Sequence, residues 1–278
     1  MNAFNVRVPA KWVLSGEHAV LRGAQAIALP HPSFSLTLNF SPGGEGLSIF
    51  PGEASHILSR VLSRIEGADE VRGRIHLESD IPIGAGLGSS AALCVALTRW
   101  VQSWSPETVC DPLEFARSLE DAFHGKSSGM DVAVILAGEP VAFRMEDGAR
   151  ALRIRDIPKF TFHDTGVRAM TRDCIEKVQA YRAADPRKGS ELDHQMSSAS
   201  LMALEALQAF DSGHGVQALP ALASAVTQAH RCFEAWGLVP SQAVDIIQDL
   251  KSKGALACKL TGAGGGGMVV ALWGPASL

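Results

Sequence analysis

IPIGAGLGSSAA, residues 81–92, places three glycines within five positions and follows them with two serines and an apolar segment. A glycine backbone can leave its N–H groups uncovered and lets a ligand approach closely. A helix beginning directly after the glycines would add unpaired N–H groups and the positive end of its dipole. Together these features predict an anion-binding loop, with phosphate as the expected anion. The alternative is a tight strand-to-helix connection without a ligand.

This first glycine segment, residues 84–90, matches no standard nucleotide fingerprint in full. It is not GxxxxGK[ST], and Gly84, Gly86 and Ser89 fill the three places of GxGxxG. A dinucleotide-binding domain would also require an acidic residue about 20 positions later at a strand end, and none is evident. A nucleotide-dependent oxidoreductase is therefore disfavoured.

A second glycine segment, residues 262–267, reads GAGGGG and follows Lys259-Leu260-Thr261. Each glycine costs roughly 0.5–1 kcal/mol of backbone entropy relative to alanine when it becomes ordered. A fold that accepts this cost five times needs its backbone to pass close to another backbone or to a ligand. We expect this segment to pack against the first glycine segment, to shape a binding pocket, or both.

Composition limits the classes of partner. The 278 residues suffice for one large or two modest domains, and 25 basic against 29 acidic residues give a net charge of −4. This balance predicts no nucleic-acid and no membrane partner. Five scattered cysteines without a CxxC pair indicate reduced thiols, and no apolar run reaches the length of a signal peptide or membrane span. We therefore expect a soluble, cytoplasmic, globular protein.

Periodicity predicts mixed strands and helices first, then mainly helices, then a closing strand pair. Strands are expected over 4–14, 33–40, 73–82 and within 132–145, and helices over 54–65, from 89 onward and from 112 onward. Four further helices are expected over 171–183, 191–210, 219–237 and 241–254, before two strands within 257–272. This order favours an α+β fold over alternating βαβ units. Charge and proline near 146–159 predict a boundary between an N-terminal domain, 1–155, and a C-terminal domain, 156–278.

Two further segments carry candidate chemistry. EDAFHGKSSGMD, residues 120–131, holds three carboxylates around a glycine turn. Phosphoryl transfer needs a carboxylate to hold Mg²⁺ and often another to accept the alcohol proton. Taken alone, Asp131 could equally cap a helix or lie on the surface. KWVLSGEHAV, residues 11–20, places Lys11 either at an ordinary strand edge or beside a reacting carboxylate or phosphate.

In this order and spacing, the segments resemble the three motifs of the GHMP kinase family and, within it, those of mevalonate kinases. The matching stretches are PAKWVLSGEHAVLRG, DIPIGAGLGSSAA and KLTGAGGGGMVVAL, and HGKSSGMD resembles the family's HGxxSGxD signature. HDTGVRAMTRDCIEKV resembles the opening of the family's C-terminal half. GEHAV favours mevalonate kinases over galactokinases, which read GEHTD-like. The resemblance extends from about residue 8 to about residue 272.

The resemblance implies a two-domain α+β GHMP kinase fold with the active site in the interdomain cleft. It implies ATP and Mg²⁺ as cofactors and phosphorylation of the primary hydroxyl of mevalonate. The residues matching the ATP phosphate loop are Gly84, Ala85, Gly86, Leu87, Gly88, Ser89 and Ser90. Ser90 and Glu120 match the family's Mg²⁺ ligands. Asp131 matches the catalytic aspartate, which Lys11 would keep ionised because a nearby cation stabilises a carboxylate.

Five residues match positions that line the alcohol pocket: Glu17, His18, Thr171, Gly264 and Gly265. His18 could hydrogen-bond the carboxylate or a hydroxyl of mevalonate. Family members are often dimers, so a homodimer is an expectation. The alternatives are a sibling kinase acting on phosphomevalonate, homoserine or a sugar, and a non-catalytic ligand-binding homologue.

Two departures from the family pattern concern the substrate. Mevalonate kinases commonly read HGNPSGxD or HGTPSGxD, whereas this chain has Lys126 and Ser127. Lys126 is either a solvated lysine or a sign of a more anionic substrate, such as a phosphorylated mevalonate. Pro30-His31-Pro32 interrupts a stretch that runs smoothly into a strand in the family.

Overall fold

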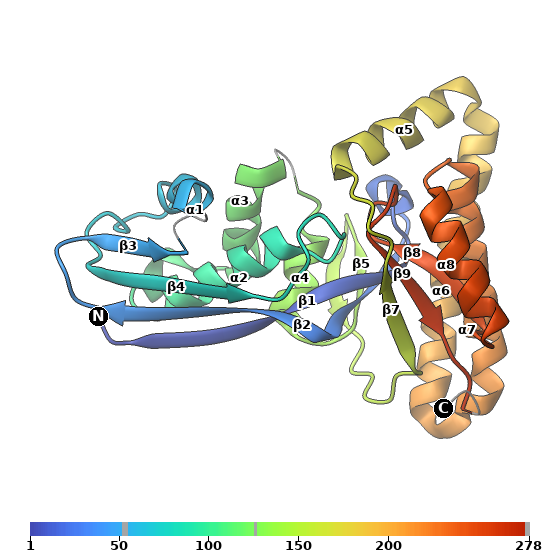
Figure 1. Cartoon of the computed structure of the whole chain (residues 1–278), viewed down its shortest axis with the longest axis horizontal. Coiled ribbons are helices and arrows are strands. Elements are labelled where there is room, and N and C mark those ends of the chain that lie inside the picture. Colours follow the sequence, from blue (N-terminus) through green and yellow to red (C-terminus); the bar gives the residue numbers. More distant parts are fainter. Residues whose placement is uncertain (52–54, 125–126, 276–278) are drawn as a thin grey trace. The chain divides into compact units, whose positions relative to one another are not determined.

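The computed structural model describes residues 1–51, 55–124 and 127–275 (Figure 1). The chain forms two compact units, and neither is continuous in sequence. Unit 1 comprises Met1–Lys11, Pro30–Ile81 and Gly88–Gly138; unit 2 comprises Trp12–Leu29, Pro82–Leu87 and Glu139–Leu278. The predicted domain division at residue 155 stays a prediction. Lys126, on which one expectation about the substrate depends, lies outside the described residues.

Unit 1 is built on paired strands. Strand β4 (Gly73–Ser79) pairs antiparallel with the second half of β2 (Ala26–Pro42) and parallel with β3 (Leu47–Phe50). Strand β1 (Phe4–Ser15) pairs with β2 and continues through Pro9. Burial alternates in the second half of β2, where Leu36, Leu38 and Phe40 turn to the core, whereas residues 26–29 are all buried.

Four α-helices belong to unit 1 and gather beside β3 and β4 in Figure 1. They are α1 (Ser55–Leu62), α2 (Ser89–Gln102), α3 (Pro112–His124) and α4 (Met130–Ala137), with a short 3₁₀ turn η3 (Pro106–Thr108). Helix α2 is buried on most of its surface, and Trp100 packs on Phe40 of β2 with ring centroids 5.5 Å apart. This packing attaches the last turn of α2 to β2.

The predicted strand within VAVILAG is wrong, because these residues belong to helix α4. A short apolar run buried on all sides has no periodicity that separates a strand from a buried helix. The boundaries of α4 are instead set by Gly129 and Gly138, whose left-handed φ angles are 82° and 67°. The strand material is limited to β5 (Val141–Arg144).

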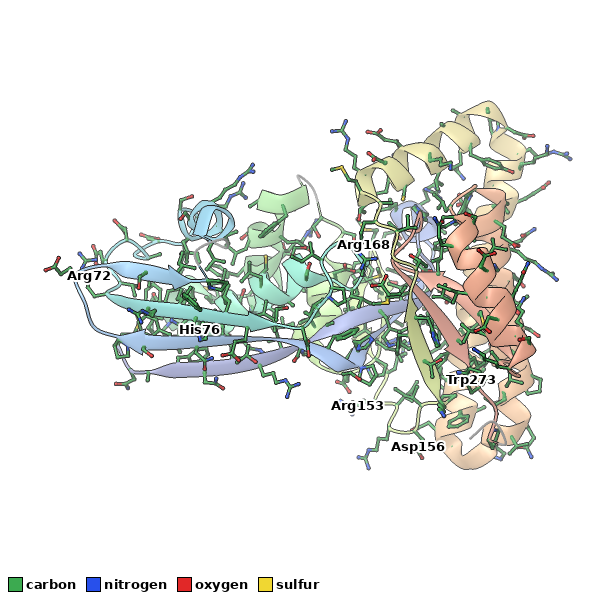
Figure 2. The ribbon with its side chains drawn as sticks, viewed as in Figure 1. Arg72, His76, Arg153, Asp156, Arg168 and Trp273 are labelled. Carbon is green, nitrogen blue, oxygen red and sulfur yellow. The ribbon has the colours of Figure 1, made fainter. Side chains whose placement is uncertain are left out.

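Unit 2 contains a three-stranded antiparallel sheet in the order β7 (Phe160–Asp164), β9 (Met268–Leu272), β8 (Ala257–Thr261). The predicted closing pair of strands is therefore confirmed. Trp273 follows β9 and donates its indole N–H to Thr161 Oγ1 at 2.8 Å (Figure 2). Strand β5 pairs with residues 26–28 of β2 and with β6 (Gly148–Ala151).

The predicted helices of unit 2 are confirmed (Figure 1). They are α5 (Thr171–Ala184), α6 (Pro186–Ala209), α7 (Gly215–Ala235) and α8 (Ser241–Ser252), with the one-turn elements η1 (Ala19–Arg22) and η4 (Phe210–His214). Helices α7 and α8 pack on this sheet, α6 packs on α7, and α5 packs on α6. Phe233, Trp236, Leu260 and Val269 share one buried apolar core. None of the helices in the described part of the chain is long and apolar enough to cross a membrane.

Candidate active site

A buried lysine and a carboxylate form the centre of the candidate site in unit 1. Lys11 comes from β1, and Asp131 lies in the first turn of α4. The Nζ of Lys11 lies 2.8 Å from Oδ2 of Asp131, and their side chains are 5% and 29% exposed. The lysine is thus held inside the fold, whereas the carboxylate keeps access to a substrate. The predicted pairing of these two residues is present.

The start of helix α2 lies against the same lysine. Gly88, the residue before the helix, has a left-handed φ of 73°. A Cβ at this position would lie 2.9 Å from Cγ of Lys11, so only glycine allows so close an approach. No side chain in the described part of the chain caps α2. Its first-turn N–H groups therefore have no side-chain partner from a cap, and they lie next to Lys11.

Glu120 is a second carboxylate of unit 1, near the end of α3, and is only 3% exposed. Burial and then the charge of Asp131 raise the pKa of Glu120 to about 7, while the hydrogen bond from Ser127 and the charge of Lys11 lower it. The hydroxyl of Ser127 donates that hydrogen bond to Oε2. A buried carboxylate under the influence of another carboxylate is a place that favours a cation.

The side chains of Glu120 and Ser90 offer oxygen atoms of the kind that Mg²⁺ takes. The described residues include no group of three or more His, Cys, Asp or Glu that could hold a metal ion by themselves. Mg²⁺ usually takes one or two protein oxygen ligands and completes its shell with water and substrate phosphates. The Glu120 carboxylate and the Ser90 hydroxyl are oxygen donors of this kind.

In unit 2 the two glycine segments pack backbone against backbone, as the sequence predicts. A Cβ at Gly86 would lie 3.0 Å from the carbonyl oxygen of Thr261, and one at Gly262 would lie 2.9 Å from Cα of Gly86. A Cβ at Gly267 would lie 2.5 Å from the carbonyl oxygen of Ala85. The entropic cost of so many glycines is thus explained by close backbone contact.

A small cavity of about 60 Å³ opens between these segments and the start of α5. Its lining residues are Gly84, Gly86, Ala169, Thr171, Thr261, Ala263, Gly264 and Gly266. Four of them, Gly84, Gly86, Thr171 and Gly264, are predicted site residues. Gly265 is not in this lining, but its N–H donates to the carbonyl of Leu238 at 2.7 Å. It therefore supports the lining of the cavity.

Arg168, which the sequence did not single out, lies beside the first glycine segment (Figure 2). Its Nε donates to the carbonyl of Ile83 at 3.1 Å, and its guanidinium pairs with Asp164 at 2.6 Å. In the sequence, the one sign of this contact is a basic residue directly after Thr165-Gly166-Val167. Arg168 fixes the start of the glycine segment through a backbone carbonyl.

Glu17 is buried and paired, at 4% exposure. Nζ of Lys259 lies 2.5 Å from its Oε1 and also donates to the carbonyl of Val13 at 3.2 Å. Lys259 is itself 1% exposed and lies over the Phe233 ring at 5.1 Å. The sequence alone gives Lys259 no role, although a lysine in an apolar strand before a glycine run is a signal. The pair fixes the turn that carries Glu17.

His18 is also buried, and its backbone has a left-handed φ of 61°. Its Nε2 donates to the carbonyl of Ala263 at 2.8 Å, so Nδ1 is the remaining acceptor. Burial lowers the pKa of His18 to about 4. A neutral ring with one acceptor nitrogen can receive a hydrogen bond from a hydroxyl but cannot donate one to a carboxylate through that atom.

The predicted site residues divide between the units. Unit 1 holds Lys11, Gly88, Ser89, Ser90, Glu120 and Asp131. Unit 2 holds Glu17, His18, Gly84, Ala85, Gly86, Leu87, Thr171, Gly264 and Gly265. In unit 1 the structure pairs Lys11 with Asp131 and places Gly88 against Lys11; in unit 2 it groups Gly84, Gly86, Thr171 and Gly264 around one cavity. The location of the active site in an interdomain cleft stays a prediction.

Comparison with known proteins gives the family. The model of the GHMP kinases N terminal domain matches residues 54–139, and that of the GHMP kinases C terminal domain matches residues 203–276. A mevalonate kinase of Aeropyrum pernix is 31% identical over 299 residues, covering 98% of this chain and 89% of the relative. One of Thermococcus sibiricus is 28% identical, covering 95% and 87%.

Solved structures agree at the level of the fold. The L. major mevalonate kinase in complex with R-mevalonate has a TM-score of 0.81 and 23% identity, covering 98% of this chain and 88% of that one. The Methanococcus jannaschii mevalonate kinase has a TM-score of 0.77 and 19% identity, covering 98% and 91%. The two family models and the match to the Aeropyrum enzyme along nearly the whole chain show that the chain belongs to the GHMP kinase family and is a kinase.

Proposed function

We propose that this kinase transfers the γ-phosphoryl group of ATP to the primary hydroxyl of mevalonate. The observation that carries the proposal is the Lys11–Asp131 pair, 2.8 Å apart beside the start of α2. The substrate rests on the mevalonate kinases that match along nearly the whole chain.

The geometry supports the following chemistry. The mevalonate oxygen forms a bond to the γ-phosphorus while the bond from that phosphorus to the bridging oxygen breaks, and ADP leaves. The hydroxyl proton passes to a carboxylate oxygen of Asp131. Lys11 stabilises the carboxylate and the negative charge that develops nearby. A loose transition state requires mainly positioning and charge stabilisation, so a weak base suffices.

Ser90 and Glu120 are the residues proposed to hold Mg²⁺. When bound, the ion neutralises charge on the ATP phosphates. The buried Glu120 has another carboxylate among the charges that act on it, which supports a cation there. Gly84 to Ser90 are proposed to receive the phosphates through their backbone N–H groups.

Glu17, His18, Thr171, Gly264 and Gly265 are proposed to form the substrate pocket. Because Glu17 and His18 are held by buried contacts, both side chains are suited to position the substrate. The acceptor nitrogen of His18 suits a mevalonate hydroxyl. A homodimer and a cytoplasmic location stay predictions, and light scattering checks the first.

A coupled assay of ADP release tests the proposed function. Mevalonate, phosphomevalonate, homoserine and galactose are compared at equal concentration with Mg·ATP, and Asp131→Asn serves as the inactive control. We expect turnover on mevalonate that collapses in the variant. Turnover on phosphomevalonate alone would retain the phosphoryl-transfer chemistry and overturn the substrate.

A further inference from the structure

Ser127 connects the Glu120 carboxylate with the turn that precedes helix α4. Its hydroxyl donates to Oε2 of Glu120 and accepts the N–H of Gly129 at 3.0 Å. A serine hydroxyl has one proton and two lone pairs, so both interactions can exist together. Gly129 directly precedes helix α4, and Asp131 lies in the first turn of that helix. One hydroxyl therefore connects the end of α3 with the start of α4.

The backbone of Ser127 strengthens the same connection. Its N–H donates to Oδ1 of Asp121, the residue after Glu120, at 2.8 Å. The turn has little freedom on its other side, since a Cβ at Gly129 would lie 3.2 Å from Cδ of Arg117. Residue 127 is thus held to α3 by both its side chain and its main chain.

This connection depends on serine at a position where the family pattern given above has proline. Proline has no N–H and no hydroxyl, so it could donate to neither Asp121 nor Glu120. We propose that Ser127 is a positioning residue that fixes the Glu120 carboxylate relative to the start of α4 and hence to Asp131. The inference rests on the proposed roles of Glu120 as a magnesium ligand and of Asp131 as the base.

A residue that orients a metal ligand affects metal binding and the chemical step. Loss of such an outer partner typically costs 10–100-fold in metal affinity or activity. We expect Ser127→Ala to lower kcat and weaken Mn²⁺ binding with a non-hydrolysable ATP analogue, each by about 10-fold, with KM for mevalonate within about twofold. Ser127→Thr, which keeps the hydroxyl, should restore both.

The experiment measures Mn²⁺ affinity by electron paramagnetic resonance and steady-state kinetics on the full chain. Ser118→Ala is the matched control, because the Ser118 hydroxyl lies within α3 and donates to a backbone carbonyl, that of Phe115, instead of a carboxylate. Thermal unfolding checks that each variant folds, and Ser127→Gly replaces Ser127→Ala if the latter does not. A double-mutant cycle with Glu120→Gln tests whether Ser127 acts through Glu120.

The outcomes separate this inference from the proposed function. The inference is supported if Ser127→Ala weakens Mn²⁺ binding and if adding Ser127→Ala to Glu120→Gln weakens it no further. This result would hold even if mevalonate is not the substrate. Unchanged Mn²⁺ binding and kcat would overturn the inference while mevalonate turnover still upheld the proposed function. Equal losses in Ser127→Ala and Ser127→Thr, or fully additive losses with Glu120→Gln, would also overturn it.

Discussion

Lys11 is the residue whose charge the proposed chemistry needs most. Lys11→Met keeps a side chain of similar length against Gly88 but removes the ammonium 2.8 Å from Asp131. Because loss of one electrostatic stabiliser costs about 10²–10³ in rate, we expect kcat to fall by that factor. Steady-state kinetics at saturating substrate measure it. Lys188→Met, at an exposed ion pair, is the control. Wild-type kcat in Lys11→Met would contradict the assigned role.

His18 makes stability depend on pH in a defined direction. Burial lowers its pKa from 6.5 to about 4. Between these values the unfolded chain binds a proton that the folded chain does not, so stability falls as pH decreases from 6.5 toward 4. One such group changes the free energy of unfolding by at most about 1.4 kcal/mol per pH unit. In urea unfolding, His18→Asn should reduce the loss of stability between pH 6.5 and pH 4, whereas His214→Asn, at an exposed histidine, should not. An unchanged slope in His18→Asn would contradict this origin.

Single residues also show which parts of the candidate site could be predicted from the sequence. Lys11, Glu120 and Asp131 were singled out because their segments match motifs of the GHMP kinase family in order and spacing; taken alone, each also had an ordinary structural explanation. Lys259 and Arg168 were missed because their tasks depend on partners distant in sequence, Glu17 and the carbonyl of Ile83. No local pattern specifies such partners.

At the scale of elements, the glycine segments permit a matched comparison. Gly267 and Gly213 have left-handed φ angles of 79° and 85°, but only at Gly267 would an added Cβ meet a neighbour, the carbonyl oxygen of Ala85 at 2.5 Å. An alanine with a left-handed φ costs about 1–2 kcal/mol at either position. We expect Gly267→Ala to lose clearly more stability than Gly213→Ala in urea unfolding. Equal losses would show that close packing does not explain the glycines.

Elements with clear periodicity were predicted well, and elements without it were not. The sequences of the four helices of the second half repeat apolar residues at helical spacing, and the structure confirms all four as α-helices. Helix α4 was wrongly predicted as a strand because its run, MDVAVILA, is apolar on almost every side. Burial on all faces removes the signal that distinguishes the two periods.

For the whole molecule, Mg·ATP should stabilise the folded chain. A ligand at about 100 times its Kd adds about 2.7 kcal/mol to the free energy of unfolding. Calorimetry should therefore show a higher Tm with Mg·ATP than with ATP and a chelator, because Ser90 and Glu120 are proposed to share the ion with the phosphates. Mg²⁺ without nucleotide is the control. Equal Tm values in the first two conditions would contradict the metal site.

The central claim is that Asp131 accepts the proton while the γ-phosphoryl group moves to mevalonate. Phosphorus NMR of ATP and mevalonate with the wild-type chain and with Asp131→Asn tests it most directly. We predict a new phosphate-monoester signal that grows as the γ-phosphate signal declines, at least about 10²-fold more slowly in the variant. No ester signal from mevalonate, or equal rates in the two proteins, would contradict the account.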